Sequence, residues 1–401
     1  MLDLHKLLTQ ITALGTYQQN RAHDLATALS AAKGQAKLVS EDISAFARKI
    51  KNAITSWLVA IPTDEDPFVA RPPAEHPTSY IVLSTDGSQV NPDRHGPHRA
   101  LLINIGQVEI GYGDFLGYRF SSEPTLFFEE KDIIRRFGGD EREVAGAVLA
   151  ALRQKMEADA LSSMISTCGK TPAVALVDGT LILWSLETNP ERLQNLSEDD
   201  LKRLSFTSLM RLLEGGKEHG TPVAGYISSP GSSDVVNALK VSLCPSEPVD
   251  CDKCIYKGAG FNEPLPCAKI NGVTDAGLFG CLLTKGERSA LFESGSQILE
   301  AYGKESIFFF YMNAGKEIAR VEVPAWVARD QKAVDLVHAI CLDQAEKGAG
   351  YPIAVAEAHE QAVVKSADKG MFDQLVSRAL VKQGTPVVES RKALRKRGGF
   401  I

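Results

Sequence analysis

The fold is decided by the run Tyr80-Ile81-Val82-Leu83-Ser84-Thr85-Asp86-Gly87-Ser88, in which apolar residues end at an acid and a glycine. A second run of this kind, Val174-Ala175-Leu176-Val177, is followed by Asp178-Gly179-Thr180. Short apolar runs bounded by turn residues are typical of strands that are buried on both faces. Both runs therefore predict central strands of a sheet.

The segments around these two strands alternate between strand-like and helix-like patterns. We expect further strands at residues 100–112, 118–128, 223–227, 307–312 and 318–323. Helical spacing of apolar residues predicts helices at about 141–164, 199–219, 235–243 and 331–347. Strands that alternate with helices predict a mixed α/β sheet flanked by helices.

The ends of the chain differ from this α/β body. Apolar residues recur at helical spacing within residues 1–61, so we expect an N-terminal helical arm that packs, docks a partner or mediates dimerisation. Residues 62–78 are rich in proline and predict a linker. The body then covers residues 79–385, with a cysteine-bearing insertion at 244–267, and a basic tail follows at 386–401.

The composition is that of an ordinary globular protein. The 401 residues include 44 Lys and Arg against 50 Asp and Glu, which gives a formal net charge of −6. This balance argues against a basic nucleic-acid coat protein, although an enzyme that acts on nucleic acid can carry a local basic groove. We find no signal-peptide pattern and no run of 18 apolar residues, so we expect a cytoplasmic protein without a membrane span.

Asp86 and Asp178 each follow the apolar run of a predicted central strand. Acids at the carboxyl ends of neighbouring strands can point to one place, where open α/β sheets bind their ligands. Carboxylates that converge there need a cation. Oxygen ligands suit Mg²⁺ or Mn²⁺, which can activate water and stabilise charge on a phosphoryl group. The alternative is that each Asp-Gly pair simply forms a turn.

Three further residues are weaker candidates for such a site. Glu157 lies in the predicted helix before the second strand, where a solvated acid is the ordinary interpretation. His359, in a helical region, could bind a metal, protonate a leaving group or simply pack. Tyr351 follows the helix stop Gly348-Ala349-Gly350 and could be a packing aromatic residue.

Four of the seven cysteines fall within 24 residues, in the pattern Cys244-x6-Cys251-x2-Cys254-x12-Cys267. Four thiolates fit a structural zinc ion or an iron–sulfur cluster, and a metal would order a segment rich in proline and glycine. Thiols without a metal in a loop, or a redox role, are the alternatives. We expect the other three cysteines to pack as small apolar residues: Cys168, Cys281 and Cys341.

Six short motifs occur in one order between about residues 80 and 375. They are Thr85-Asp86-Gly87-Ser88-Gln89, Leu176-Val177-Asp178-Gly179-Thr180-Leu181, Ala224-Gly225-Tyr226-Ile227-Ser228, Gly286-Glu287-Arg288-Ser289, Ile318-Ala319-Arg320-Val321-Glu322-Val323-Pro324, and Gly350-Tyr351-Pro352 followed by Ala358-His359. In this order and spacing the chain resembles the NurA family of nucleases, partners of the HerA ATPase in DNA end processing.

The resemblance implies a ribonuclease H-like fold with a Mn²⁺-dependent nuclease site. It implies five site residues, of which all but the tyrosine would bind the metal: Asp86, Glu157, Asp178, Tyr351 and His359. Asp159 stays an alternative to Glu157 because their helix carries no distinctive motif. The resemblance further implies a homodimer that degrades DNA, with 5′–3′ exonuclease and single-strand endonuclease activity. A HerA-type translocase would assist it in resection of double-strand breaks.

Two arginines within the motifs, Arg288 and Arg320, are candidates for contacts to DNA phosphates, because a guanidinium group matches phosphate bidentately. Ion pairs within the protein are the alternative for both. Two other functions stay open for the whole chain. One is a non-catalytic adaptor of the ATPase, and the other is a nucleic-acid-binding protein stapled by a metal at the cysteines.

Overall fold

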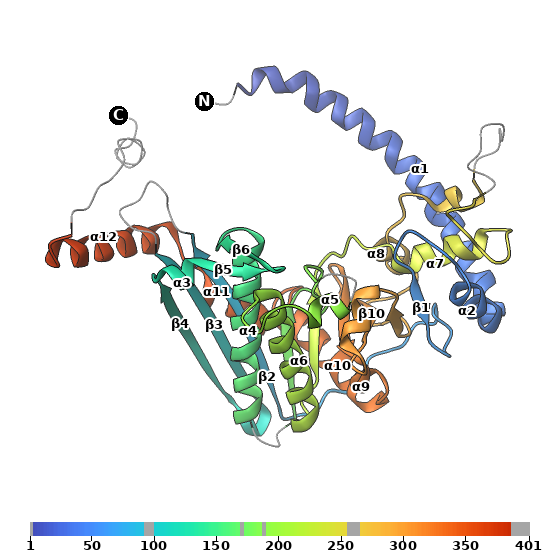
Figure 1. Cartoon of the computed structure of the whole chain (residues 1–401). Coiled ribbons are helices and arrows are strands. Elements are labelled where there is room, and N and C mark those ends of the chain that lie inside the picture. Colours follow the sequence, from blue (N-terminus) through green and yellow to red (C-terminus); the bar gives the residue numbers. More distant parts are fainter. Residues whose placement is uncertain (1–2, 92–99, 169–171, 187–189, 255–264, 386–401) are drawn as a thin grey trace. The chain divides into compact units, whose positions relative to one another are not determined.

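The computed structural model describes residues 3–91, 100–168, 172–186, 190–254 and 265–385 (Figure 1). The chain forms two compact units, and each is built from separated segments. Unit 1 comprises Met1–Pro73, Ile227–Leu299 and Ser306–Glu322. Unit 2 comprises Ala74–Tyr226, Glu300–Glu305 and Val323–Ile401. The predicted basic tail at 386–401 lies outside the described residues, and the predicted domain boundaries stay predictions.

Unit 2 is built on five strands: β2 (Tyr80–Val90), β3 (Leu101–Tyr112), β4 (Gly117–Phe127), β7 (Ala173–Asp178) and β8 (Val223–Ile227). Their order is β8-β7-β2-β3-β4, so the two strands predicted from the apolar runs are neighbours. β2, β3 and β4 are antiparallel, whereas β7 runs parallel to both β2 and β8. This mixed sheet is the ribonuclease H-like arrangement, and the predicted fold class is confirmed.

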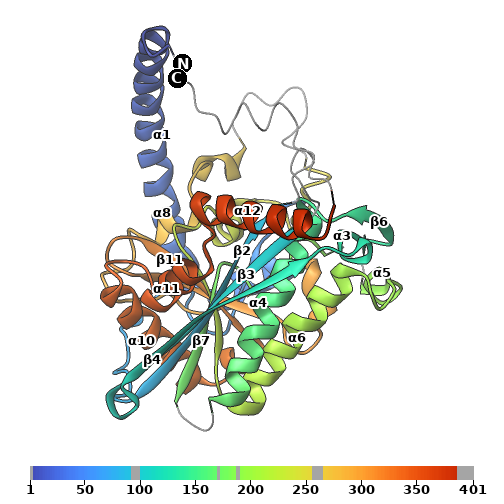
Figure 2. The same cartoon turned by 90° about the vertical axis from the view of Figure 1, so that its left-hand side faces the viewer.

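Helices cover both faces of this sheet (Figure 2). α4 (Ala147–Thr167) and α6 (Leu201–His219) pack together on the face where alternate residues of β3, such as Ile103 and Ile105, are buried. α11 (Ile353–Ala362) packs on β2 and β3. Its backbone lies against Gly106, the neighbour of Ile105 in β3. Successive residues of a strand point to opposite faces, so α11 covers the face opposite α4.

The other elements of unit 2 are α3 (Glu130–Ile133), β5 (Ile134–Phe137), β6 (Asp140–Glu143), α5 (Pro190–Gln194), α9 (Ala325–Ala328), α10 (Gln331–Lys347) and α12 (Ser366–Lys382). β5 and β6 form a hairpin that turns through Gly138 and Gly139, with φ of +67° and +90°. Because this hairpin takes residues up to 143, α4 begins later than the predicted start near residue 141.

Unit 1 contains four strands in the order β1 (Ala60–Pro62), β9 (Phe292–Ser294), β10 (Ile307–Asn313) and β11 (Ile318–Pro324). Its helices are α1 (Leu8–Glu41), α2 (Ile43–Lys51), α7 (Asp234–Leu243) and α8 (Asp275–Phe279). Aromatic rings form part of its core. The ring of Phe279 stacks on that of Tyr311 with centroids 4.8 Å apart.

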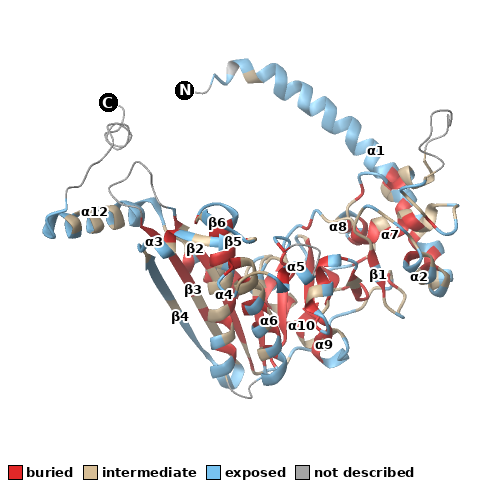
Figure 3. Cartoon of the chain, viewed as in Figure 1, coloured by how far each residue is buried: buried red, intermediate tan, exposed pale blue. Residues whose placement is uncertain are grey.

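The N-terminal arm is helical, as predicted, and is buried only toward its end (Figure 3). In α1 the buried residues are Ala28, Ala32, Ala36 and Val39. The helix therefore packs within unit 1 through its second half. Docking of a partner and dimerisation stay predictions for the exposed half. Across the described residues, no helix has both the length and the apolar character that crossing a membrane requires.

Candidate active site

Asp86 lies inside a strand, not at its end. β2 continues through Asp86, which pairs with Gly106 of β3, and Gly87 is also part of the ladder. The turn interpretation of this Asp-Gly pair is therefore wrong. Asp178, by contrast, is the last residue of β7, and the chain bends at Gly179, which adopts φ +95°. β2 and β7 are parallel neighbours in which Thr85 pairs with Val177, so the two acids that follow lie at the same level of the sheet.

Three of the predicted acids line one cavity within unit 2. Asp86 of β2, Glu157 of α4 and Asp178 of β7 form part of the wall of a cavity of about 80 Å³. Most of the remaining wall is apolar: Ala158, Leu161, Val177, Leu181, Leu183, Leu209 and Leu212. Apolar surroundings lower the local dielectric constant, which strengthens both the repulsion among carboxylates and their attraction for a cation.

Glu157 is partly buried, and 22% of its side chain is exposed. Its Oε1 atom is buried and accepts no hydrogen bond, but the Nε atom of Arg153 lies 3.3 Å away as an ion-pair partner. Burial raises the pKa of Glu157 to about 7; the Arg153 guanidinium opposes this increase, and the charges of Asp86 and Asp178 add to it. The pKa of Glu157 stays raised although Arg153 is near, so a cation bound beside the carboxylate would further favour its ionised form.

The donor set around the cavity fits a hard divalent cation, because three carboxylates from three elements supply oxygen ligands. Within the ranges that the structure describes, no group of three or more Asp, Glu, His or Cys side chains already has the arrangement of a metal site. Asp86, Glu157 and Asp178 would therefore have to adjust their side chains to share an ion.

The choice between Glu157 and Asp159 follows from their contacts. Asp159 does not line the cavity. Its carboxylate instead pairs with Lys155, 2.6 Å away on the same helix, and with Arg211 on α6 at 3.4 Å. The structure thus brings Glu157, and not Asp159, to the other two acids.

His359 is held beside Asp86 on the face covered by α11. Its Nδ1 atom lies 2.8 Å from Asp86 Oδ2, and the carboxylate accepts the hydrogen bond. β2 and β3 anchor the end of α11, since Ser88 Oγ and Asn104 Nδ2 donate to the Ala362 carbonyl, at 2.5 and 2.8 Å. Glycine is required at position 106, because a Cβ atom there would lie 2.3 Å from the Ala358 carbonyl oxygen.

Ser88, Asn104 and Gly106 therefore place His359, and the sequence interpretation missed the last two. Gly106 lies directly opposite Asp86 in the β2–β3 ladder. A glycine in a strand interior often marks the close approach of another backbone, and this signal was available in the sequence.

Tyr351 makes the corresponding contact to Asp178. Its hydroxyl donates to Asp178 Oδ1 at 2.8 Å. Its ring packs edge-on against Tyr226 of β8, with centroids 5.7 Å apart. Gly350, at φ +118°, turns the chain after α10. Tyr351 is thus both a packing aromatic residue and a neighbour of the acids.

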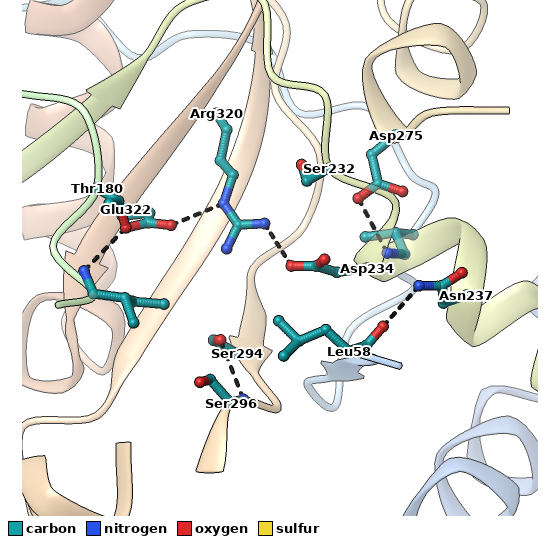
Figure 4. Close-up of polar contacts among 12 residues, drawn as sticks. Leu58, Thr180, Ser232, Asp234, Asn237, Asp275, Ser294, Ser296, Arg320 and Glu322 are labelled. Atoms are coloured by element: carbon teal, nitrogen blue, oxygen red, sulfur yellow. Dashed lines mark hydrogen bonds and ion pairs between the residues drawn. The ribbon is translucent and has the colours of Figure 1, made fainter. Parts of the chain in front are cut away.

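Arg320 is buried in unit 1 within a network of charges (Figure 4). Its Nη1 atom donates to Asp234 at 2.7 Å and its Nε atom to Glu322 at 2.9 Å. The guanidinium group also lies 3.6 Å from the ring centroid of Phe309. These contacts agree with the alternative of an internal ion pair. A guanidinium group that is buried and paired on several sides does not reach the phosphates of bound DNA.

Arg288 is also buried, with 3% of its surface exposed. Its Nη1 atom donates to the carbonyl of Ser289 at 2.9 Å, and its guanidinium lies over the ring of Phe310. Neither of the two candidate arginines therefore presents its guanidinium at the surface, where a phosphate contact would form.

The same unit contains a buried acid that the sequence interpretation missed, Asp275 (Figure 4). It accepts hydrogen bonds from the backbone N–H groups of Val235 and Val236, in the first turn of α7, and from the hydroxyl of Tyr311 at 2.7 Å. Burial raises the pKa of Asp275 to about 7, and the nearby Asp234 adds to this. Its role is to cap α7.

The clustered cysteines all lie in unit 1, in its described part, and are partly buried. Burial raises the pKa of the Cys267 thiol, and the thiols of Cys244 and Cys254 contribute to this, so these three groups lie near one another. They do not surround a common point as metal ligands do. The structural-metal hypothesis, which includes Cys251, stays a prediction.

The other three cysteines differ in environment. Cys341 is fully buried, and burial raises its pKa to about 12, as expected for a packed thiol. Cys168 is partly buried. Cys281 is exposed, so the expectation that it packs in the core is wrong.

Comparison with solved structures found several NurA proteins. The NurA nuclease from Sulfolobus solfataricus is 14% identical, with 86% of this chain and 95% of that chain covered and a TM-score of 0.47. A structure of NurA with manganese is 10% identical over 77% and 91% of the two chains, with a TM-score of 0.40. A structure of NurA bound to dAMP and manganese is 11% identical over 91% and 95%, with a TM-score of 0.38. No curated protein matches the chain.

The sequence itself decides the family. The family model described as the NurA domain matches residues 80–364, which is more than half of the chain. The match begins at β2 and ends just after α11, so it contains all five predicted site residues. The resemblance read from the motifs is confirmed, and the chain belongs to the NurA family.

Proposed function

We propose that this protein is a deoxyribonuclease that hydrolyses phosphodiester bonds with a divalent cation, Mn²⁺ or Mg²⁺. One observation carries the proposal. Asp86, Glu157 and Asp178 come from separate elements and line one cavity, while His359 and Tyr351 are hydrogen-bonded to two of these acids. Carboxylates that converge beside apolar walls favour a cation as their shared partner.

The three carboxylates would hold the cation, together with His359 if its ring turns from Asp86. When bound, such a cation supplies an activated water and stabilises charge on a phosphoryl group. With Nδ1 donating to Asp86, Nε2 of His359 is the ring nitrogen that could give a proton to a leaving oxygen once the ring is doubly protonated, which leaves a neutral imidazole behind. Tyr351 orients Asp178 through its hydroxyl.

Membership of the family supports a more detailed proposal. We propose 5′–3′ exonuclease and single-strand endonuclease activity in the resection of DNA double-strand breaks. The partner would be a HerA-type hexameric translocase that delivers DNA to a homodimer of this chain in the cytoplasm. The alternative is an adaptor of the ATPase without catalysis, and the intact set of acids argues against it.

The experiment compares Asp86→Asn with wild-type protein on linear duplex and single-stranded DNA, labelled at the 5′ or 3′ end, with MnCl₂ or MgCl₂. Asp159→Asn is the matched control, because it removes an acid of α4 that pairs with Lys155 outside the cavity. We expect metal-dependent cleavage by the wild type and the control but not by Asp86→Asn. Cleavage by folded Asp86→Asn at the wild-type rate would reject the site.

The same assay with a HerA-type ATPase separates the two functions. A wild-type protein that is inactive in both metals, alone and with the ATPase, would favour the adaptor.

A further inference from the structure

Arg153, which no sequence motif contains, links two of the elements that carry the acids, α4 and β2. It lies one helical turn before Glu157 in α4, and its Nε atom is 3.3 Å from Glu157 Oε1. Its Nη1 atom donates to the carbonyl of Gly87 at 3.2 Å and to the side chain of Gln89 at 3.4 Å. One guanidinium group thus connects the carboxylate of α4 to the backbone of β2 next to Asp86.

The packing of Arg153 and Glu157 against β2 explains why a glycine follows Asp86. A Cβ atom at Gly87 would lie 2.5 Å from Glu157 Oε1 and 2.7 Å from Arg153 Cγ. Both side chains therefore lie directly on the backbone of β2. Only a residue without a side chain leaves room for this arrangement at position 87.

The arrangement also balances charge. Asp86 and Asp178 act on Glu157 with the same sign of charge, and Arg153 is the cation that opposes them. The side chains of Arg153 and Glu157 are 34% and 22% exposed, so solvent screens the ion pair only in part. A guanidinium group has donors in a fixed planar fork, which suits a position that must contact two sides at once.

We propose that Arg153 is a positioning residue of the metal site. It holds the Glu157 carboxylate against β2 and in line with Asp86, so that the acids are ready to share a cation. The inference rests on the proposed function, and it adds a residue that acts through Glu157. Residues that orient metal ligands typically contribute about 10- to 100-fold in metal affinity or activity.

The test uses Arg153→Lys in the full-length protein. Lysine keeps the charge but cannot bond Gly87, Gln89 and Glu157 together. The control is Lys155→Met, which breaks the Lys155–Asp159 pair at the same i,i+4 spacing on the same helix, outside the cavity. Three quantities are measured: the affinity for Mn²⁺, by titration calorimetry without DNA, and kcat and KM for cleavage of single-stranded DNA.

We expect Arg153→Lys to weaken Mn²⁺ binding and to lower kcat, each by about 10- to 100-fold, with KM for DNA nearly unchanged. Lys155→Met should match the wild type in all three. Wild-type Mn²⁺ affinity in Arg153→Lys would overturn the inference, since charge alone would then suffice. A higher KM with unchanged kcat would overturn it too, by assigning Arg153 to DNA contact.

If Arg153→Lys does not fold, Gln89→Ala decides, because it removes only one acceptor of the guanidinium group. Weaker Mn²⁺ binding by Gln89→Ala supports the inference, and wild-type binding overturns it. Failure of the proposed function is a separate result. In that case the wild type and Lys155→Met themselves neither bind Mn²⁺ nor cleave DNA.

Discussion

Replacing Glu157 by Gln should abolish metal-dependent cleavage and at the same time stabilise the metal-free protein at neutral pH. The side chain is 22% exposed, and burial raises its pKa from 4.5 to about 7. The folded protein therefore binds this proton more tightly than the unfolded chain does. Stability is lost as the pH rises from about 4.5 to about 7, and the full loss persists above that range.

The size of the effect follows from the shift in pKa. A displacement from 4.5 to about 7, at 1.36 kcal/mol per unit, corresponds to roughly 3 kcal/mol of unfolding free energy. Gln is close in shape to the protonated acid and carries no charge at any pH. The advantage of Glu157→Gln should therefore be near zero at pH 4.5 and approach about 3 kcal/mol at pH 8.

The assay is urea unfolding, followed by circular dichroism, of wild type and Glu157→Gln at several pH values in the presence of a chelator. Replacing the chelator by Mn²⁺ should stabilise the wild type more than the variant, since only ligands of the folded state add stability. Asp159→Asn serves as the control. A variant that is less stable than the wild type at pH 8 without metal, or a difference that does not change with pH, would refute the reasoning.

Three further predictions concern Gly87, Asp275 and the clustered cysteines. Gly87→Ala should lower kcat by about 10-fold or more, because the new Cβ atom displaces the Glu157 carboxylate. Steady-state kinetics will measure the loss, and a urea melt will show that the variant is folded under the assay conditions. Asp275→Asn removes a carboxyl group whose pKa is raised from 3.8 to about 7. The unfolding free energy of the variant, relative to that of the wild type, should therefore increase by up to about 4 kcal/mol between pH 4 and pH 8, and parallel pH profiles of the two proteins would contradict this. If the clustered thiols hold a structural metal, elemental analysis of wild-type protein will find zinc or iron, and a variant with Cys251→Ser and Cys254→Ser will lack it; metal-free wild type rejects that hypothesis.

The central strands were predictable because their signal is local. The runs before Asp86 and Asp178 are apolar and short, and both form strands buried in the sheet. The end of β2 was not predictable in this way. Its ladder with β3 continues past Gly87 to Val90, and a ladder depends on a partner strand elsewhere in the chain.

The candidate site residues within the motifs could be predicted from the sequence, but the contacts that hold them in place could not. Asp86 and Asp178 follow from strand patterns, whereas Glu157, Tyr351 and His359 were only weak candidates until the family resemblance supported them. Arg153 lies four residues before Glu157, a spacing that predicts an ion pair on a helix. Its hydrogen bond to Gly87 in β2 could not be predicted from the sequence, because it joins residues that are far apart in the chain. The burial of Arg320 was hidden because its partner Asp234 lies 86 residues away.

The most direct test of the central claim is X-ray diffraction from crystals grown with MnCl₂, recorded near the manganese absorption edge. We predict an anomalous peak at the cavity in unit 2, within coordination distance of oxygens from Asp86, Glu157 and Asp178. Crystals of folded protein that show no anomalous peak at this cavity, or show one only at the cysteines, would contradict the proposed metal site.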